Sequence, residues 1–175
     1  MKDHYGFCMH LSKEDNKKLL PIIKKLSNKY DKGDLFLPHI SVNGSRLIDY
    51  NVAKEIANEC IKGISRFKVE KESIQYSNQW SKTLFIQLKE NHNLIEINKR
   101  LNKLLRQGKP PYQLNPHISL MYRSGLDSKI KYTLAKTINT PGTFTVSSIA
   151  LVTGSSVGNW KNYSNWKIVY ERALM

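Results

Sequence analysis

The tetrapeptide Pro-His-Ile-Ser occurs twice in the chain, and its histidines and serines are residue types that can act on a phosphate ester. The first copy contributes His39 and Ser41, and the second contributes His117 and Ser119. Successive side chains on a β-strand point to opposite faces, so the His and Ser of each copy share one face. Each copy is therefore expected to present an imidazole and a hydroxyl to a site, and an isoleucine to the core.

Two imidazoles that face one phosphate can supply both proton transfers of phosphodiester hydrolysis. An unperturbed imidazole titrates at about pH 6.5, so one histidine can accept a proton from water while the other donates one to the leaving oxygen. The hydroxyls of Ser41 and Ser119 can donate hydrogen bonds to the non-bridging oxygens. We interpret His39 and His117 as catalytic and the two serines as substrate-binding. The motifs look alike, so they leave open which histidine is the acid.

Two other chemistries fit these residues less well. A serine hydrolase has no use for a second, identical His-x-Ser element beside its triad. A zinc site would need a third Cys, His or acidic ligand, and none stands at a recognisable spacing from His39 and His117. We therefore expect neither a metal nor another cofactor.

The strands that carry the motifs belong to a repeated order of elements. A shift of 78 residues aligns His39 with His117 and Ser41 with Ser119. Each half follows the order strand, helix, strand bearing His, helix, strand. A first helix, capped by Ser12, reaches Tyr30 and is either kinked at Pro21 or starts near it. Predicted strands cover residues 5–11, 35–42, 67–69, 83–88, 114–122, 143–152 and 166–170, a turn covers 43–45, and further helices cover 52–64, 91–105 and 127–138.

This order predicts an α+β fold with two duplicated lobes, in which two antiparallel-type sheets with outer helices surround a central cleft. The whole chain, residues 1–175, is expected to form one domain, and the repeats cover approximately 5–76 and 83–172. A cleft between the lobes would collect one His-Ile-Ser element from each. The duplication thus predicts that the two motifs act on one substrate.

The charge of the chain favours an anionic partner. Lys and Arg number 28 and Asp and Glu 14, which gives a formal net charge of +14. Such an excess attracts RNA, nucleotides or phosphorylated small molecules, although lysines on solvated helix faces would give the same composition. We expect the partner to be a nucleotide or an RNA-derived phosphodiester.

Composition also indicates where the protein works. No apolar run approaches the roughly 20 residues that cross a bilayer, and the N-terminal residues lack the apolar segment of a signal peptide. Cys8 and Cys60 lie in apolar surroundings without the close pairing of zinc ligands, which predicts two buried thiols. We expect a cytoplasmic monomer that makes no membrane contact.

The two motifs resemble those of the two-histidine (2H) phosphoesterases, a superfamily defined by two His-x-Ser/Thr motifs in a bilobal α+β fold. The resemblance spans nearly the whole chain. Residues 116–122, Pro-His-Ile-Ser-Leu-Met-Tyr, are most similar to the second motif of cyclic phosphodiesterases of the plant and fungal type. The tail from Phe144 to Val169 has a layout similar to their final hairpin.

The resemblance implies metal-independent opening of a cyclic phosphate, either a nucleoside 2′,3′-cyclic phosphate or ADP-ribose 1″,2″-cyclic phosphate. It further implies that His117 activates water, that His39 protonates the leaving oxygen and that Tyr122 contacts the nucleotide. Strict alternation from His117 places Tyr122 on the opposite face, so we expect it where the strand ends or twists. The plant enzymes carry a Trp on the first strand where this chain has Cys8 or Met9, which leaves the substrate open.

Other functions are compatible with the same catalytic pair. One is a 2H enzyme that cleaves 2′-5′ linkages or cyclic oligonucleotides, including antiviral signalling nucleotides. Another is an RNA-binding or RNA-end-processing module whose basic surface matters more than turnover. His10 could line the cleft or be a structural histidine. Tyr76 and Trp80 could stack on a base or pack in the core. The basic residues that could attract phosphate or lie on the solvated surface are Lys82, Lys109 and Arg123.

Overall fold

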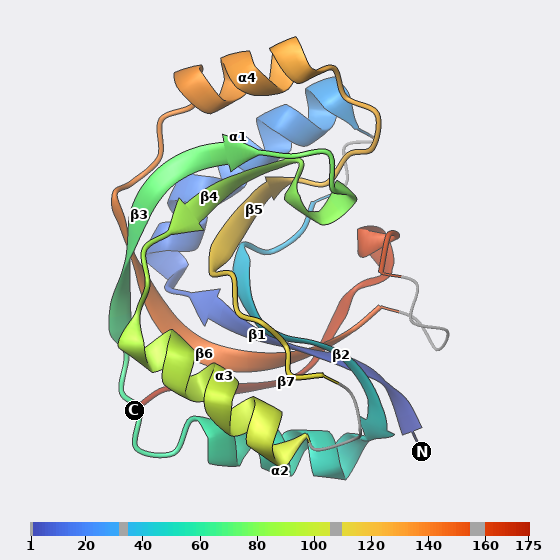
Figure 1. Cartoon of the computed structure of the whole chain (residues 1–175), viewed down its shortest axis with the longest axis vertical. Coiled ribbons are helices and arrows are strands. Elements are labelled where there is room, and N and C mark those ends of the chain that lie inside the picture. Colours follow the sequence, from blue (N-terminus) through green and yellow to red (C-terminus); the bar gives the residue numbers. More distant parts are fainter. Residues whose placement is uncertain (1, 32–34, 106–109, 155–159) are drawn as a thin grey trace.

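A computed structural model describes residues 2–31, 35–105, 110–154 and 160–175 of the chain. Strands and helices alternate along it as the repeat predicts (Figure 1). The elements in these ranges are β1 (Lys2–Leu11), α1 (Lys13–Tyr30), β2 (His39–Asp49), α2 (Tyr50–Cys60), β3 (Phe67–Tyr76), β4 (Leu84–Leu88), α3 (His92–Leu104), β5 (His117–Met121), α4 (Ser128–Thr137), β6 (Thr143–Thr153) and β7 (Lys167–Ala173), with short 3₁₀ helices at Trp80–Lys82 and Tyr163–Asn165.

The strands pair antiparallel in the order β2-β1-β6-β3-β4-β5, and β7 lies beside β6. Exchanging β1, β2 and β3 for β4, β5 and β6 reproduces the same order in reverse, which is the pseudo-twofold symmetry expected of a duplication. β3 joins the two halves of the sheet, because Phe67–Glu70 pair with β6 and Lys71–Tyr76 pair with β4. The predicted α+β class is confirmed, and the predicted repeat boundaries fall between β3 and β4.

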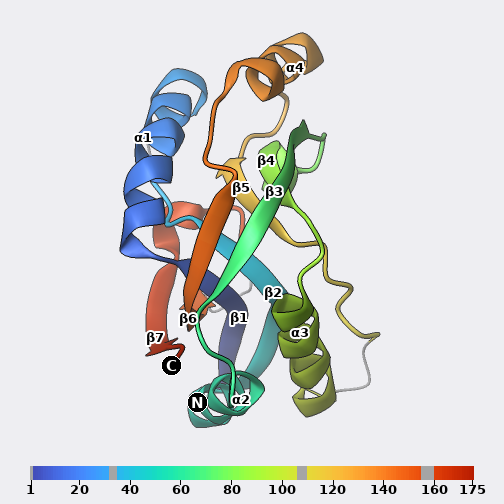
Figure 2. The same ribbon diagram turned by 90° about the vertical axis from the view of Figure 1, so that its left-hand side faces the viewer.

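Two helices cover each half of the sheet (Figures 1 and 2). Helices α2 and α3 pack together, with α2 against β1, β2 and β6 and α3 against β2. Helix α1 contacts β5, and α4 contacts β3 and β4. Each repeat therefore contributes its first helix and its last strand to the lobe that holds the other repeat's histidine strand.

Helix α1 starts after its predicted capping residue. Ser12 Oγ accepts a hydrogen bond from the Asp15 backbone N–H at 3.2 Å, and Asn91 and Asp127 cap α3 and α4 in the same way. Helix α1 begins at Lys13, so the alternative start near Pro21 is wrong. Pro21 lies inside this helix, which buries one apolar stripe against the core.

Several strand limits differ from the prediction. The turn predicted at Asn43-Gly44-Ser45 is wrong, because β2 continues to Asp49 and its register against β1 shifts in this region. Such bulges let a strand accommodate a Gly without ending. The strands expected at 35–42 and 114–122 begin only at the two histidines. The candidate Lys109 lies outside the described residues.

The core lies between the sheet and its four helices and includes both cysteines. Cys8 and Cys60 are buried and unpaired with each other, and burial raises the pKa of each thiol to about 12. The prediction of two buried thiols is confirmed. Within the described ranges, no helix is both long and apolar enough to span a bilayer.

Candidate active site

Both motif histidines are the first residue of a strand, and both are held in the same way. His39 Nδ1 lies 2.8 Å from the Leu37 carbonyl oxygen, and His117 Nδ1 lies 2.7 Å from the Asn115 carbonyl oxygen. A carbonyl only accepts, so each Nδ1 carries a proton and donates it to the carbonyl two residues earlier. This tautomer leaves each Nε2 available to accept or donate the proton of a substrate.

Burial holds both imidazoles neutral in the unliganded chain. Burial lowers the pKa of His39 to about 4. The hydrogen bond to the Leu37 carbonyl raises this pKa, whereas charge on His10 or His117 lowers it. Burial also lowers the pKa of His117, and the nearby Lys82 ammonium adds to this effect. An anionic phosphate would raise the pKa of either histidine that contacts it. Both shifts therefore favour neutral imidazoles until an anion binds beside them.

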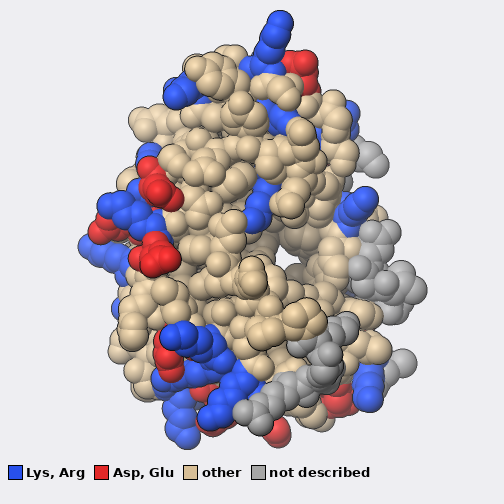
Figure 3. All heavy atoms as spheres, in the orientation of Figure 1, with Lys and Arg blue, Asp and Glu red and all other residues tan. Residues whose placement is uncertain are grey.

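The two histidine strands come together although they stand at opposite ends of the strand order. Strands β2 and β5 are in contact, and the face seen in Figure 1 is hollowed near its centre (Figure 3). His117 packs edge-on against Phe85 with 5.5 Å between ring centroids, and the Lys82 ammonium lies 5.9 Å from the same Phe85 ring. Lys82, which the sequence offered only as a possible phosphate contact, thus lies beside the second motif.

Two cavities meet at His39. One of about 180 Å³ contains His39 and Ser41 and extends along β2, and another of about 120 Å³ contains His39 and His10. Trp166 lines both and stands edge-on to His39 with 5.8 Å between ring centroids. The other residues of the larger cavity are Gly6, Cys8, Asn43, Gly44, Ser45, Tyr112, Val152 and Trp160.

The two motif serines have different surroundings. Ser41 is partly exposed, lines the larger cavity and hydrogen-bonds the Cys8 thiol. Ser119 is only 4% exposed, and its Oγ donates to the Ser81 carbonyl at 2.9 Å. The Ser41 hydroxyl is thus the one that already faces a cavity, whereas Ser119 would have to release Ser81 before donating to a phosphate.

Tyr122 directly follows the last residue of β5, where the expected strand end lies, and its ring is buried in an aromatic cluster. Its ring stacks on the Trp80 ring with 4.9 Å between centroids and packs at a tilt against the Phe36 ring with 4.4 Å between centroids. Tyr163 and Trp166 complete this cluster. Burial raises the pKa of Tyr122, so its hydroxyl stays protonated. The aromatic cluster connects Tyr122 to the tryptophan beside His39.

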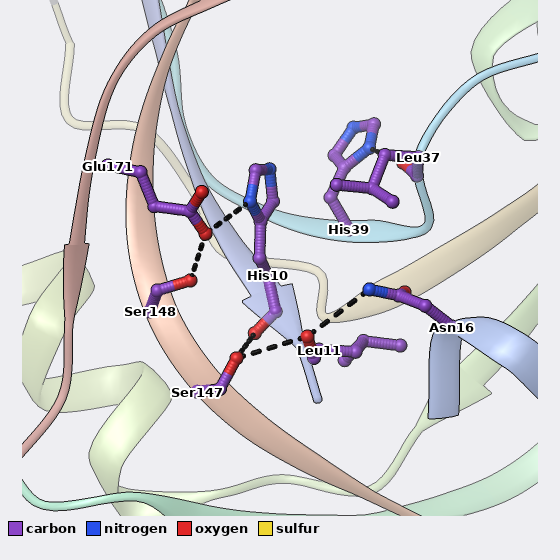
Figure 4. A network of polar contacts seen from close by, with 8 residues as sticks. All are labelled: His10, Leu11, Asn16, Leu37, His39, Ser147, Ser148 and Glu171. Carbon is purple, nitrogen blue, oxygen red and sulfur yellow. Dashed lines mark hydrogen bonds and ion pairs between the residues drawn. The ribbon is translucent and has the colours of Figure 1, made fainter. Parts of the chain in front are cut away.

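His10 lies in the site, as one of the two readings of the sequence allowed. It pairs with His39 across β1 and β2, is 3% exposed, and its Nδ1 lies 3.0 Å from Glu171 Oε1 (Figure 4). Ser148 donates to the same carboxylate oxygen. Burial alone would raise the pKa of Glu171, but the hydrogen bonds from Ser148 and His10 outweigh it and lower this pKa. A fixed imidazole–carboxylate pair thus stands next to His39.

The remaining candidates lie elsewhere. Trp80 packs against the core under Tyr122, and Tyr76 is 39% exposed at the end of β3. Arg123 Nη1 lies 3.7 Å from Asp31 Oδ1, so these two residues form an ion pair. Sequence reasoning missed Asn43, Tyr112, Trp160 and Trp166 as cavity residues. The two-residue spacing from His39 and Ser41 to Asn43 was no usable signal, because β2 is bulged there and Asn43 pairs with the core residue Phe7.

The alternative chemistries gain little from the fold. Among the described residues, no three His, Cys, Asp or Glu side chains cluster closely enough to hold a metal ion. Residues 154–158, Gly-Ser-Ser-Val-Gly, match the pattern of a nucleophile elbow, which joins a strand to a following α-helix. Residues 155–158 of this segment lie outside the described part of the chain, so the structure does not describe a nucleophile elbow there.

Solved structures with the same fold cover nearly the whole chain. Escherichia coli LigT complexed with 3′-AMP aligns with a TM-score of 0.60 and 15% identity over 100% of this chain and 99% of its own. The protein TT0787 of Thermus thermophilus aligns with a TM-score of 0.60 and 14% identity over 99% and 98%. Kluyveromyces marxianus Usb1 aligns with a TM-score of 0.56 and 11% identity over 99% and 98%.

The family model of the 2′-5′ RNA ligase superfamily matches residues 17–157, a range that contains both motifs. A comparison with curated proteins finds no match. The family match covers most of the chain and agrees with the paired, identically anchored histidines. The chain therefore belongs to the 2′-5′ RNA ligase superfamily of two-histidine phosphoesterases.

Proposed function

We propose that the protein is a phosphodiesterase that hydrolyses a cyclic phosphate, a nucleoside 2′,3′-cyclic phosphate or ADP-ribose 1″,2″-cyclic phosphate, by acid–base catalysis without a metal. The observation that carries this proposal is the identical anchoring of His39 and His117. Each Nδ1 is committed to a backbone carbonyl, which leaves two Nε2 atoms on contacting strands for proton transfer. Family membership supports phosphodiester chemistry or RNA processing in general.

The reaction needs one neutral and one charged imidazole. The neutral histidine accepts a proton from water through Nε2 as the water oxygen bonds to phosphorus. The bond from phosphorus to one ribose oxygen breaks, and the charged histidine protonates that oxygen. Ser41, which lines the cavity at His39, would donate to a non-bridging oxygen, and the Lys82 charge beside His117 would add electrostatic stabilisation. The product is a ribose phosphate monoester.

The electrostatics favour His39 as the base and His117 as the acid. The pKa of His39 is lowered to about 4, so His39 is the histidine that is harder to charge at neutral pH. Burial and the nearby Lys82 ammonium also lower the pKa of His117, and a bound phosphate anion would restore part of its basicity. This assignment is the reverse of the one that the resemblance implies.

The test is a product-resolved assay of purified protein against the four nucleoside 2′,3′-cyclic phosphates, ADP-ribose 1″,2″-cyclic phosphate, 2′-5′ oligoadenylate and cyclic dinucleotides. We expect turnover of a cyclic phosphate and its loss in His39→Ala and His117→Ala, with kcat reduced at least about 100-fold because general acid–base catalysis contributes that much. His92→Ala, at an exposed position on α3, is the matched control.

The proposal fails if His39→Ala or His117→Ala keeps the full activity of the wild type and of the His92→Ala control. Cleavage of only 2′-5′ linkages or cyclic dinucleotides would assign the same residues to a different substrate. Tight RNA binding that survives loss of both histidines, without turnover of any substrate, would favour an RNA-binding module, for which the net charge of +14 is the supporting observation.

A further inference from the structure

A buried histidine without a role in the proposed reaction stands beside His39. His10 is 3% exposed, pairs with His39 across β1 and β2, and pairs with Ser148 across β1 and β6. The register of both pairings is regular from Cys8 to His10. Directly opposed residues of antiparallel strands point to the same face, with their Cβ atoms about 4.5–5.5 Å apart. His39, His10 and Ser148 therefore form one polar row across three neighbouring strands.

A carboxylate from β7 holds the middle of this row. Glu171 Oε1 lies 3.0 Å from His10 Nδ1 and accepts a hydrogen bond from Ser148 Oγ (Figure 4). Burial raises the pKa of Glu171, but these two bonds lower it below its ordinary value, so the carboxylate is ionised and can only accept. His10 therefore carries a proton on Nδ1, and once protonated on Nε2 as well it forms an ion pair with Glu171. A fixed negative charge thus stabilises a positive charge on His10.

Little lies between the two imidazoles to screen this charge. The cavity of about 120 Å³ that joins them is walled by apolar and aromatic side chains, of which only Tyr163 can ionise, among the residues that the structure describes. On its other side His10 lines a wider cavity of about 550 Å³, where the further charged residues are Lys13, Glu14 and Arg66. These three side chains are exposed, so solvent screens them, whereas an apolar cavity screens much less.

We propose that His10, held and charged by Glu171, acts on the reaction through His39 as a positioning residue that keeps this base in its neutral, proton-accepting form. A positive charge directly opposite His39 opposes the arrival of a second one. In agreement, the pKa of His39 is lowered mainly by burial and, against the Leu37 hydrogen bond, by charge on His10 and His117. The inference rests on the proposed function, in which His39 is the base.

The wild-type protein provides the first test, without a substrate. Histidine imidazoles are titrated by NMR, and the resonances of His39 and His10 are identified by their loss in His39→Gln and His10→Asn. We expect His10 to be charged already at the pH at which His39 takes up its proton. A neutral His10 at that pH would overturn the proposal, because it would then have no charge to act with.

Two variants of His10 separate its charge from its packing. His10→Asn keeps a donor for Glu171 but has no charge, and it should raise the titration midpoint of His39 by about 0.5–1 pH unit, the effect of one unit charge at this separation. His10→Lys replaces the charge and should keep the midpoint of the wild type. His4→Asn, on the same strand, is the control and should also leave this midpoint unchanged.

The acid limb of the pH profile of kcat/KM should move in the same direction. It falls as His39 gains its proton, so it should shift to higher pH in His10→Asn and stay in place in His10→Lys and His4→Asn. Equal His39 midpoints in the wild type and a folded His10→Asn protein refute the inference, as does an equal rise in His10→Lys. A shifted midpoint without hydrolysis of any cyclic phosphate would instead refute the proposed function and leave the coupling of the two histidines standing.

Discussion

Acidification should destabilise the folded chain through His39 by an amount that the burial of this residue sets. The pKa of His39 lies near 4 in the folded chain, against 6.5 for an ordinary histidine, which the unfolded chain would show. Below pH 6.5 the unfolded state therefore binds a proton that the folded state refuses, and stability falls with pH until the folded pKa is reached. One pKa unit corresponds to about 1.4 kcal/mol, so His39 should lower the free energy of unfolding by about 2 kcal/mol at pH 5.

The assay is urea unfolding at pH 7 and pH 5, followed by tryptophan fluorescence, for the wild type and His39→Gln. Carboxylates titrate in both proteins, so the difference between the two pH dependences isolates His39. We expect the wild type to lose about 2 kcal/mol more than His39→Gln between the two pH values. His92→Gln, at an exposed position, should behave as the wild type does. Equal losses in the wild type and His39→Gln would refute the reasoning, because His39 would then titrate alike in both states.

Two further predictions concern the cavity walls and the absence of a cofactor. A Cβ at Gly154 would lie 3.0 Å from Trp160 Cε3 and 3.1 Å from Trp166 Cδ1, so Gly154→Ala should displace these rings, cost about 1–3 kcal/mol in urea unfolding and lower kcat/KM, whereas Gly142→Ala, with nothing within 4 Å, should do neither. Unchanged kinetics in Gly154→Ala would show that the tryptophans do not shape the site. Hydrolysis should also persist in EDTA, and a loss that zinc or manganese restores would contradict metal-independent catalysis.

Much of the fold follows from periodic patterns that depend on local chemistry. The duplicated order of elements, the capping residue Ser12 and the placement of both motifs at strands all agree with the structure. These features succeed because each depends on neighbours within a few residues. The exchange of β3 and β6 between the lobes could not be predicted, since antiparallel pairing over long separations leaves no mark on local spacing.

Candidate-site residues could be predicted where a local motif identifies them, but not where their position depends on contacts with distant segments of the chain. The choice of His39 and His117 as candidates follows from their motifs, but the burial that lowers the pKa of His39 depends on cavity walls from segments far from β2 in the sequence. Trp160 and Trp166 come from the chain after β6, more than a hundred residues from the first motif. The turn predicted at Asn43 failed because Asn-Gly is a turn signal that a bulged strand can also hold.

The place of β6 in the sheet has a consequence for how the chain matures. Strand β6 lies between β1 and β3, so the strands made earlier are joined into one sheet only once residues 143–153 are available. On the ribosome, β1 keeps an open edge for most of translation, a state in which chaperones bind and aggregation competes. We therefore expect a chain that stalls before residue 143 to carry both motifs without the strand that pairs with β1 and β3.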